Sequence, residues 1–179
     1  MTRQIVLLRG INVGAHRRVA MADLRALLGD AGYDEIKTLG QSGNLVLSAK
    51  QANPERLGGE LENQIAEGLE VQAKVVVRTC AELAAVVAYN PLAEIAQEPK
   101  LYQVSFLSAK PDPQAIKAIK AIDTFPEQWT RKGREIYAWH PKGIHNSPLA
   151  KLLSDKRLGV AVTARNWNTV TKLLELAQS

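Results

Sequence analysis

Two successive stretches of the chain predict the same order of secondary structure, and this repetition limits the fold more than any single motif does. Each stretch starts with an apolar run of strand length and continues with apolar residues at helical spacing, followed by strand, strand, helix and strand. In the first stretch, the expected strands are residues 5–11, 36–39, 44–48 and 71–78, and the expected helices start near Met21 and at Asn53-Pro54. The asparagine side chain can cap a helix whose first position is proline, which makes the second start well defined.

The second stretch gives this order again, after a short connecting helix. Thr79 and Glu82 form a capping box for that helix, which we expect to end near Asn90. The expected strands are residues 101–108 and 160–164, together with a hairpin inside 125–139 that turns at 131–134. The expected helices start after Asp112, after Ser147 and at Trp167.

Two βαββαβ units in tandem predict an α+β protein made of two ferredoxin-like (α/β-plait) subdomains with a C-terminal helix. We expect subdomain 1 over residues 1–79, a connecting helix and linker over 80–98, and subdomain 2 with the C-terminal helix over 99–179. A chain of 179 residues is long enough for two small cores of this kind.

The composition restricts the class of protein only mildly. The formal net charge of +5 favours anionic partners, although many proteins without such partners share it. Cys80 is the only cysteine, so no disulfide framework or cysteine-based metal site is expected, and a buried structural role is favoured for it. No apolar run approaches the roughly 20 residues that span a bilayer, and the N-terminus lacks a signal-peptide pattern. We therefore expect a cytoplasmic protein with no membrane partner.

Four segments of the chain are unusual enough to suggest a family. They are LLRGINVG, QSGN, YAWHPKGIHNSPLAKLL and LGVAVTARNWNTVTKLLELA. Together, and over essentially the whole chain, they resemble the bacterial family described only as domain of unknown function 1697 (DUF1697). The resemblance implies two ferredoxin-like halves and no established activity, cofactor or catalytic residue. Ala15 departs from the family pattern, which often has a second glycine at that position.

The first candidate site is the loop after the first strand, which contains Arg9, Gly10, Asn12 and Gly14. Backbone N–H groups of a glycine-containing loop can surround an anion, and Arg9 can pair with it through two hydrogen bonds. The loop lacks the ending of a P-loop and the glycine spacing of a dinucleotide-binding fingerprint. In the alternative interpretation, the glycines serve the turn and Arg9 caps a neighbouring element.

Ser42 and Asn44 form a second candidate on either side of Gly43. The composition of a hairpin turn explains all three residues without a ligand. A binding role for them is suggested only by the family resemblance.

The third candidate lies at the start of the last helix, at Thr163, Arg165, Asn166 and Trp167. We expect Asn166 or Asn168 to cap this helix and Trp167 to pack, which leaves Thr163 and Arg165 unexplained. If this helix lies beside the first candidate loop, Arg9 and Arg165 converge on one anion. Alternatively, Arg165 forms a buried ion pair that holds the subdomains together.

Aromatic residues are concentrated in the second subdomain. Side chains alternate along a strand, so Tyr102 and Phe106 share one face, as do Tyr137 and Trp139. In RNA-recognition modules of similar topology such rings stack on bases, and the basic turn at residues 131–134 would contact phosphates. We favour the alternative, in which this face packs on the other subdomain or on the last helix, because the first subdomain's strands have no aromatic residues.

No catalytic or metal-binding pattern stands out. His16, His140 and His145 do not have the spacing of metal ligands, and neither a carboxylate pair nor a nucleophile elbow is present. We expect no cofactor and no metal. An enzyme acting on a phosphorylated small molecule, with His140 or His145 as proton carrier, is the second functional hypothesis.

The first hypothesis is a non-enzymatic protein that binds a phosphate-bearing small molecule or a nucleic acid. Its proposed ligand contacts are Arg9, Asn12, Lys142, Arg165 and Asn166, of which Lys142 supplies long-range attraction. A protein-interaction module that uses the aromatic face of subdomain 2 is the third hypothesis.

Overall fold

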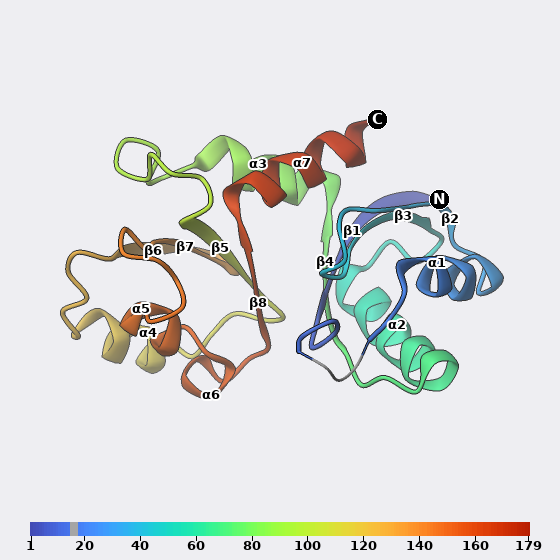
Figure 1. Cartoon of the computed structure of the whole chain (residues 1–179), viewed down its shortest axis with the longest axis horizontal. Coiled ribbons are helices and arrows are strands. Elements are labelled where there is room, and N and C mark those ends of the chain that lie inside the picture. Colours follow the sequence, from blue (N-terminus) through green and yellow to red (C-terminus); the bar gives the residue numbers. More distant parts are fainter. Residues whose placement is uncertain (15–17) are drawn as a thin grey trace. The chain divides into compact units, whose positions relative to one another are not determined.

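The structure is a computed structural model that describes residues 1–14 and 18–179 (Figure 1). It divides into two compact units, of which unit 1 comprises Met1–Ala85 with Lys172–Ser179 and unit 2 comprises Val86–Thr171. Each unit contains one four-stranded antiparallel sheet.

Unit 1 contains the first six elements of the chain. They are β1 (Thr2–Arg9), α1 (Met21–Asp30), β2 (Asp34–Thr38), β3 (Asn44–Ala49), α2 (Pro54–Leu69) and β4 (Lys74–Thr79). The strand order is β2-β3-β1-β4, and α1 and α2 lie on the same face of this sheet (Figure 1). Between the helices and the sheet is an apolar core that includes Val6, Leu8, Leu24, Leu47, Leu61 and Val77.

Helix α2 follows the local signals of its sequence. The Asn53 side chain accepts hydrogen bonds from the backbone N–H groups of Glu55 and Arg56, both at 3.0 Å, so the predicted cap is confirmed. Gly58 weakens the helix on propensity alone, but a Cβ at this position would lie 3.2 Å from the carbonyl oxygen of Val75. The absence of a side chain at Gly58 therefore lets α2 pack closely on β4.

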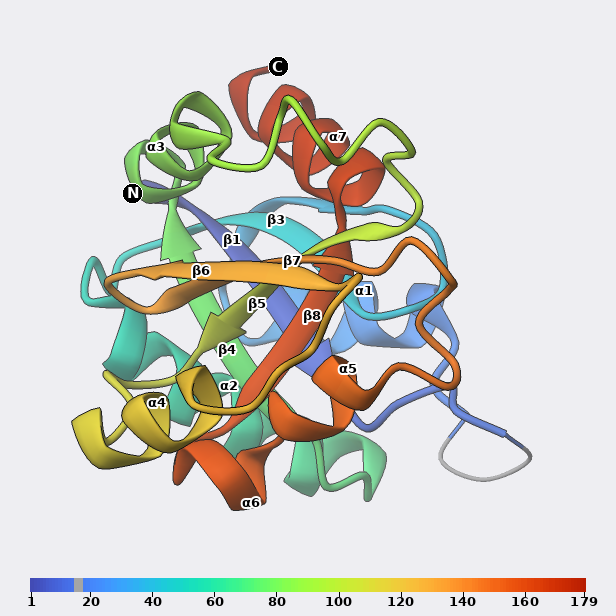
Figure 2. The same ribbon diagram turned by 90° about the vertical axis from the view of Figure 1, so that its left-hand side faces the viewer.

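Unit 2 contains β5 (Tyr102–Leu107), α4 (Pro113–Lys120), β6 (Gln128–Lys132), β7 (Glu135–Trp139), α5 (Pro148–Leu152), α6 (Asp155–Leu158) and β8 (Val162–Asn166). The strand order β6-β7-β5-β8 matches that of unit 1. Figure 2 shows α4, α5 and α6 on one side of the sheet of unit 2. They cover a second apolar core, which includes Leu107, Ile116, Ile136, Leu149, Leu158 and Val162.

Helices α3 (Cys80–Tyr89) and α7 (Trp167–Gln178) start directly after β4 and β8, and the boundary between the units falls within each of them. Thr79 and Glu82 form the predicted capping box, with hydrogen bonds of 2.8 and 3.1 Å. At the second junction, the Asn166 side chain accepts a 2.9 Å hydrogen bond from the backbone N–H of Thr169. The expected cap at Asn166 is thus confirmed.

The described residues form a mixed α+β protein with two four-stranded antiparallel sheets and seven helices. The expected fold class and the repeated order of elements are confirmed at this level. One helix was missed, because the helix expected after Ser147 ends at Leu152 and the extended backbone at Ser154 starts a separate α6. None of the described helices has the length and apolar character needed to cross a membrane.

Candidate functional site

Two glycine-containing loops lie side by side in unit 1. After β1, the φ angles of Gly10, Asn12 and Gly14 are 85°, 53° and 68°, in the left-handed region. The loop between β2 and β3 approaches so closely that a Cβ on Gly43 would lie 2.6 Å from the Cβ of Leu8. The carbonyl of Gly43 also accepts a 2.8 Å hydrogen bond from the backbone N–H of Leu8. The LLRGINVG and QSGN motifs therefore form one local structure.

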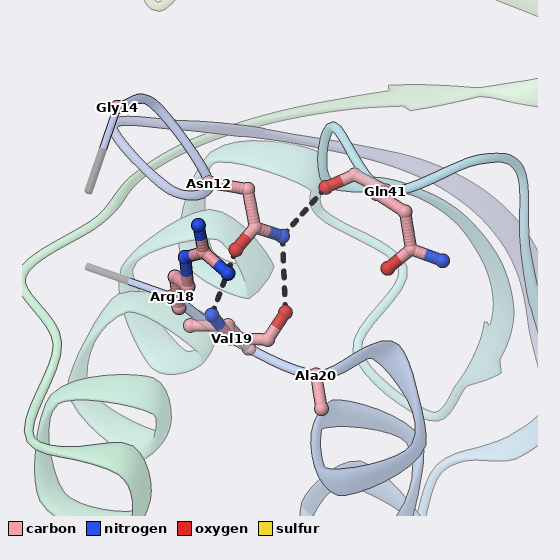
Figure 3. A pocket seen from close by; sticks show the side chains of 6 residues that line it. All are labelled: Asn12, Gly14, Arg18, Val19, Ala20 and Gln41. Carbon is pink, nitrogen blue, oxygen red and sulfur yellow. Dashed lines mark hydrogen bonds between the residues drawn. The ribbon is translucent and has the colours of Figure 1, made fainter. Parts of the chain in front are cut away.

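The side chain of Asn12 fastens three chain segments together (Figure 3). Its Nδ2 donates to the carbonyl of Val19 at 3.0 Å and to the carbonyl of Gln41 at 2.6 Å. Its Oδ1 accepts from the backbone N–H of Val19 at 2.8 Å. Both donors of the amide are thus used by the protein. Asn12 therefore shapes this site, and both N–H groups of its side-chain amide already donate to the protein.

A pocket of about 360 Å³ opens beside Asn12. It is lined by Asn12, Gly14, Arg18, Val19, Ala20 and Gln41. Arg18 and Gln41 are exposed, and Figure 3 shows the Arg18 guanidinium beside the Asn12 amide, whereas the Gln41 amide points away from it. The described lining residues therefore offer one cation and one neutral amide to a bound molecule.

Helix α1 starts at this pocket, since Ala20 is its N-cap residue. No side chain of the described residues caps the helix, so none of these side chains satisfies its first N–H groups. The positive end of a helix dipole favours an anion at such a position, although Asp23 in the first turn offsets part of this field. The start of α1 and Arg18 thus favour the same sign of charge.

The structure brings together two of the predicted residues of the N-terminal half and leaves others outside the pocket lining. Asn12 and Gly14 line the pocket, but Arg9, Gly10, Ser42 and Asn44 do not. Asn44 is buried and donates to the carbonyl of Leu39 at 3.2 Å, which closes the turn. Ala15 and His16 lie outside the described residues.

Sequence reasoning missed four lining residues: Arg18, Val19, Ala20 and Gln41. The basic character of the stretch before α1 and the QSGN motif were the only signals for them. Neither signal says that Asn12 joins the two stretches.

The predicted residues of the C-terminal half lie in unit 2, and two of them, Arg165 and Thr163, are hydrogen-bonded to each other. Arg165 donates from Nη1 to the hydroxyl of Thr163 at 2.8 Å and to the carbonyl of Ala164 at 2.9 Å. Burial lowers the pKa of Arg165 to about 10, so the guanidinium keeps its charge at neutral pH. Arg9 belongs to unit 1, and its convergence with Arg165 on one anion stays a prediction.

Three of the four aromatic side chains predicted to form a face in unit 2 are buried, and Trp139 is partly buried. Tyr102 stacks on Trp167, with ring centroids 4.8 Å apart and an interplanar angle of 12°. Tyr137 meets Tyr89 edge to face at 5.5 Å, and Phe106 is buried as well. Rings buried in this way offer no platform for bases, and the packing of Tyr102 on the start of the last helix follows the alternative that the sequence favoured.

His140 lies in a buried polar cluster and not in an open site. Its side chain is 1% exposed, and its Nδ1 lies 2.9 Å from both Glu127 Oε1 and Ser147 Oγ. Glu127 Oε2 accepts from the backbone N–H of Leu149 at 2.9 Å, and Ser147 Oγ from that of Ala150 at 2.8 Å. Because the carboxylate and the hydroxyl both contact Nδ1, the cluster is not arranged as a catalytic triad.

Burial opposes the ionisation of Glu127, but hydrogen bonds from Ser147, His140 and the backbone of Leu149 outweigh it and lower its pKa. The cluster therefore holds an ionised carboxylate that ties the start of α5 to the end of β7. His145 and Lys142 are exposed in the loop that follows β7.

In the described parts of the chain, no group of three or more His, Cys, Asp or Glu side chains could hold a metal ion. Cys80 is a free thiol at the first position of α3 and is partly, not fully, buried.

Comparisons with known proteins agree with this fold and assign no activity. The solved structure of "conserved bacterial protein SP0830 from Streptococcus pneumoniae" is similar, with a TM-score of 0.78 and 22% identity over 98% of both chains. No curated protein matches the chain in sequence. The profile of the family described as "Protein of unknown function (DUF1697)" matches residues 1–137, a range that contains the β1 loop and the QSGN turn. The chain belongs to the DUF1697 family.

Proposed function

We propose that unit 1 binds a small anionic ligand, such as a phosphate-bearing metabolite, in the pocket beside Asn12. The observation that carries this proposal is the exposed Arg18 guanidinium in a pocket of about 360 Å³ at the start of α1. Volumes of this order accommodate small ligands. We propose a binding protein because the described lining residues supply a cation and an amide that can hold a ligand.

Three of the lining residues have distinct roles in this proposal. Arg18 pairs with the anion through up to two hydrogen bonds, and the start of α1 adds its positive field. Gln41 orients the neutral part of the ligand with its side-chain amide. Asn12 holds Val19 and Gln41 in place and so presets the distance between the two sides of the pocket.

Thermal unfolding with a panel of inorganic phosphate, sugar phosphates, nucleoside monophosphates and short single-stranded oligonucleotides tests the proposal. A ligand that binds only the native state at about 100 times its Kd adds roughly 2.7 kcal/mol to the free energy of unfolding. We expect this stabilisation in the wild type and in Arg157→Gln, a control that removes an exposed arginine of α6, but not in Arg18→Gln. Stabilisation that survives Arg18→Gln would place the ligand elsewhere.

The oligonucleotides separate the two kinds of phosphate ligand. Nucleic-acid binding weakens steeply as salt rises, because several phosphate contacts release counterions. A single pocket with one described cation predicts that ligand binding depends only weakly on salt. It also predicts that mononucleotides stabilise the protein as strongly as oligonucleotides do. The small-molecule ligand is therefore the one we propose.

We also propose that each half is a ferredoxin-like subdomain, covering residues 1–79 and 99–179 with a connecting segment over 80–98. The strand orders β2-β3-β1-β4 and β6-β7-β5-β8 support this assignment, since each places the first strand of its half between the third and the fourth. Helices on one face of each sheet also fit a βαββαβ unit.

A further inference from the structure

An exposed aromatic side chain lies in the segment between α4 and β6 of unit 2. The Phe125 side chain is 82% exposed, and Ile122, three residues before it, is 44% exposed. Single exposed apolar side chains are ordinary on protein surfaces. Two exposed apolar side chains in one short turn need an explanation if hydrogen bonds fix the turn in this conformation.

Hydrogen bonds within the turn do hold it. The backbone N–H of Phe125 donates to the carboxylate of Asp123 at 3.0 Å, and that of Glu127 donates to the carbonyl of Thr124 at 2.8 Å. The hydroxyl of Thr124 returns a 3.1 Å hydrogen bond to the carbonyl of Glu127. The turn is closed on itself in a conformation that leaves Phe125 in solvent.

The same turn is anchored in the interior by Glu127. This carboxylate is buried and uses one oxygen for His140 and the other for the backbone of Leu149. A buried carboxylate costs much free energy unless it is hydrogen-bonded in this way. The polar cluster and the exposed turn are therefore connected through Glu127. Its buried hydrogen bonds fix the end of the turn, and Phe125 at the tip of the turn is exposed.

Two lysines precede the tip in the sequence, and the tip itself contains the exposed carboxylate of Asp123. Lys117 and Lys120 occupy the last turn of α4, within eight residues of Phe125, and both are exposed. Within the described part of the chain, neither side chain makes a hydrogen bond or an ion pair. The chain as a whole carries +5. An exposed apolar turn that follows two unpaired lysines in the sequence suits a lipid surface, which has anionic headgroups above an apolar layer.

We propose that the turn at Ile122 and Phe125, with Lys117 and Lys120, docks unit 2 reversibly on an anionic lipid surface. Two side chains are too few for a specific protein interface, which buries about 800 Å² on each partner. They suffice for shallow insertion at the headgroup boundary of a bilayer, where apolar burial and lysine attraction add. The sequence excluded a membrane partner on the absence of a spanning segment, which surface docking does not require.

Sedimentation with vesicles tests the docking. The full chain is mixed at low salt with vesicles of phosphatidylglycerol and phosphatidylcholine in equal amounts, or of phosphatidylcholine alone. We expect binding to the anionic vesicles only. Phe125→Ser should weaken binding about tenfold, and Lys117→Gln with Lys120→Gln should weaken it on the order of twentyfold.

Val13→Ser is the matched control, because Val13 is 74% exposed and lies in unit 1. It should leave vesicle binding unchanged. Absence of binding by the wild type, equal binding to uncharged vesicles, or equal losses in Val13→Ser and Phe125→Ser would each overturn the proposal. Self-association that depends on concentration and disappears in Phe125→Ser would overturn it too, because a second copy would then cover the turn.

Discussion

At the scale of single residues, Gly43 has little freedom to change. Its φ of +77° is unfavourable for any other residue, and an added Cβ would lie 2.6 Å from the Cβ of Leu8 and 3.0 Å from Cδ1 of Ile11. Gly40 has a similar φ of +67° but open space around it. Substitutions at Gly40 and Gly43 therefore separate the free-energy cost of a left-handed backbone from the cost of a steric clash.

We expect Gly40→Ala to lower the free energy of unfolding by about 1–2 kcal/mol through the left-handed backbone alone. Gly43→Ala should lower the free energy of unfolding by a further amount of about 1–3 kcal/mol, because the added methyl group overpacks the site. Urea denaturation of both variants measures the difference. Equal losses would mean that the two loops relax apart without cost.

Glu127 gives the residue-scale prediction for pH. Its native pKa lies below the ordinary value of 4.5, so its ionised form stabilises the fold above that pH. This contribution is lost as the pH falls through the native pKa. We expect Glu127→Gln to lower the free energy of unfolding at neutral pH by about 1–3 kcal/mol, because buried hydrogen bonds are lost.

The difference between Glu127→Gln and the wild type should then narrow as the pH falls below 4.5. Denaturant unfolding over a series of acidic buffers measures it, with Glu94→Gln on the surface as control. A difference that stays constant over the acid range would show that the charge of Glu127 does not contribute.

The residue scale is also where the sequence predicted least of the candidate site. Asn12 and Gly14 were found because they belong to a recognisable loop, but Arg18 was not. Its place beside Asn12 depends on hydrogen bonds from Asn12 to Val19 and Gln41, which lie 7 and 29 residues away along the chain. Pattern recognition in one sequence does not reveal pairs at such separations.

At the scale of elements, the two strand-to-helix junctions of the chain repeat one design. An arginine stands one position before the end of β4 and of β8, and its Nη1 donates to the preceding carbonyl at 2.9 Å in both cases. The next residue, Thr79 or Asn166, caps the helix that follows. Arg78 and Arg165 thus occupy matching positions in the two units.

If these caps act alike, Thr79→Ala and Asn166→Ala should each lower the free energy of unfolding by about 1 kcal/mol. Thr79→Ser and Asn166→Asp keep the accepting oxygen and should stay within a few tenths of the wild type. Chemical denaturation of the four variants makes the comparison. A loss in only one alanine variant would mean that the two junctions differ in stability despite their shared geometry.

The elements were predicted well where their signals are local. Asn53, Asp112 and Ser147 each cap a helix that has proline at its start, and each cap hydrogen bond spans at most three residues. The sequence favoured burial of the aromatic face but did not say what covers it, because the stacking of Tyr102 on Trp167 joins residues 65 positions apart. Local chemistry determines where a helix starts but not what its first side chain covers.

At the scale of the whole molecule, the C-terminal half of α7 belongs to unit 1. Leu173 is buried, and the Arg3 guanidinium donates to the carbonyl of Ala177 at 3.2 Å while pairing with Glu35 at 2.8 Å. Lys37 donates to the hydroxyl of Ser179 at 2.9 Å. Residues 172–179 therefore stabilise a unit from which they are distant in sequence.

We expect Leu173→Ala to cost about 2–5 kcal/mol and to act first on unit 1. Hydrogen exchange should then show a loss of protection in β1 and β3 while β5 and β7 keep theirs. Leu149→Ala, in the core of unit 2, should give the opposite pattern. Identical patterns in both variants would mean that the units unfold as one.

The split composition of unit 1 also has a consequence for synthesis on the ribosome. Residues 86–171 are contiguous, so unit 2 has all its parts as soon as Thr171 has left the exit tunnel. Unit 1 starts the chain but lacks its last segment until residues 172–179 emerge. The unit whose first residues are translated first therefore receives its last segment after every residue of unit 2 has been added, so its core lacks the packing of α7 until residues 172–179 are present.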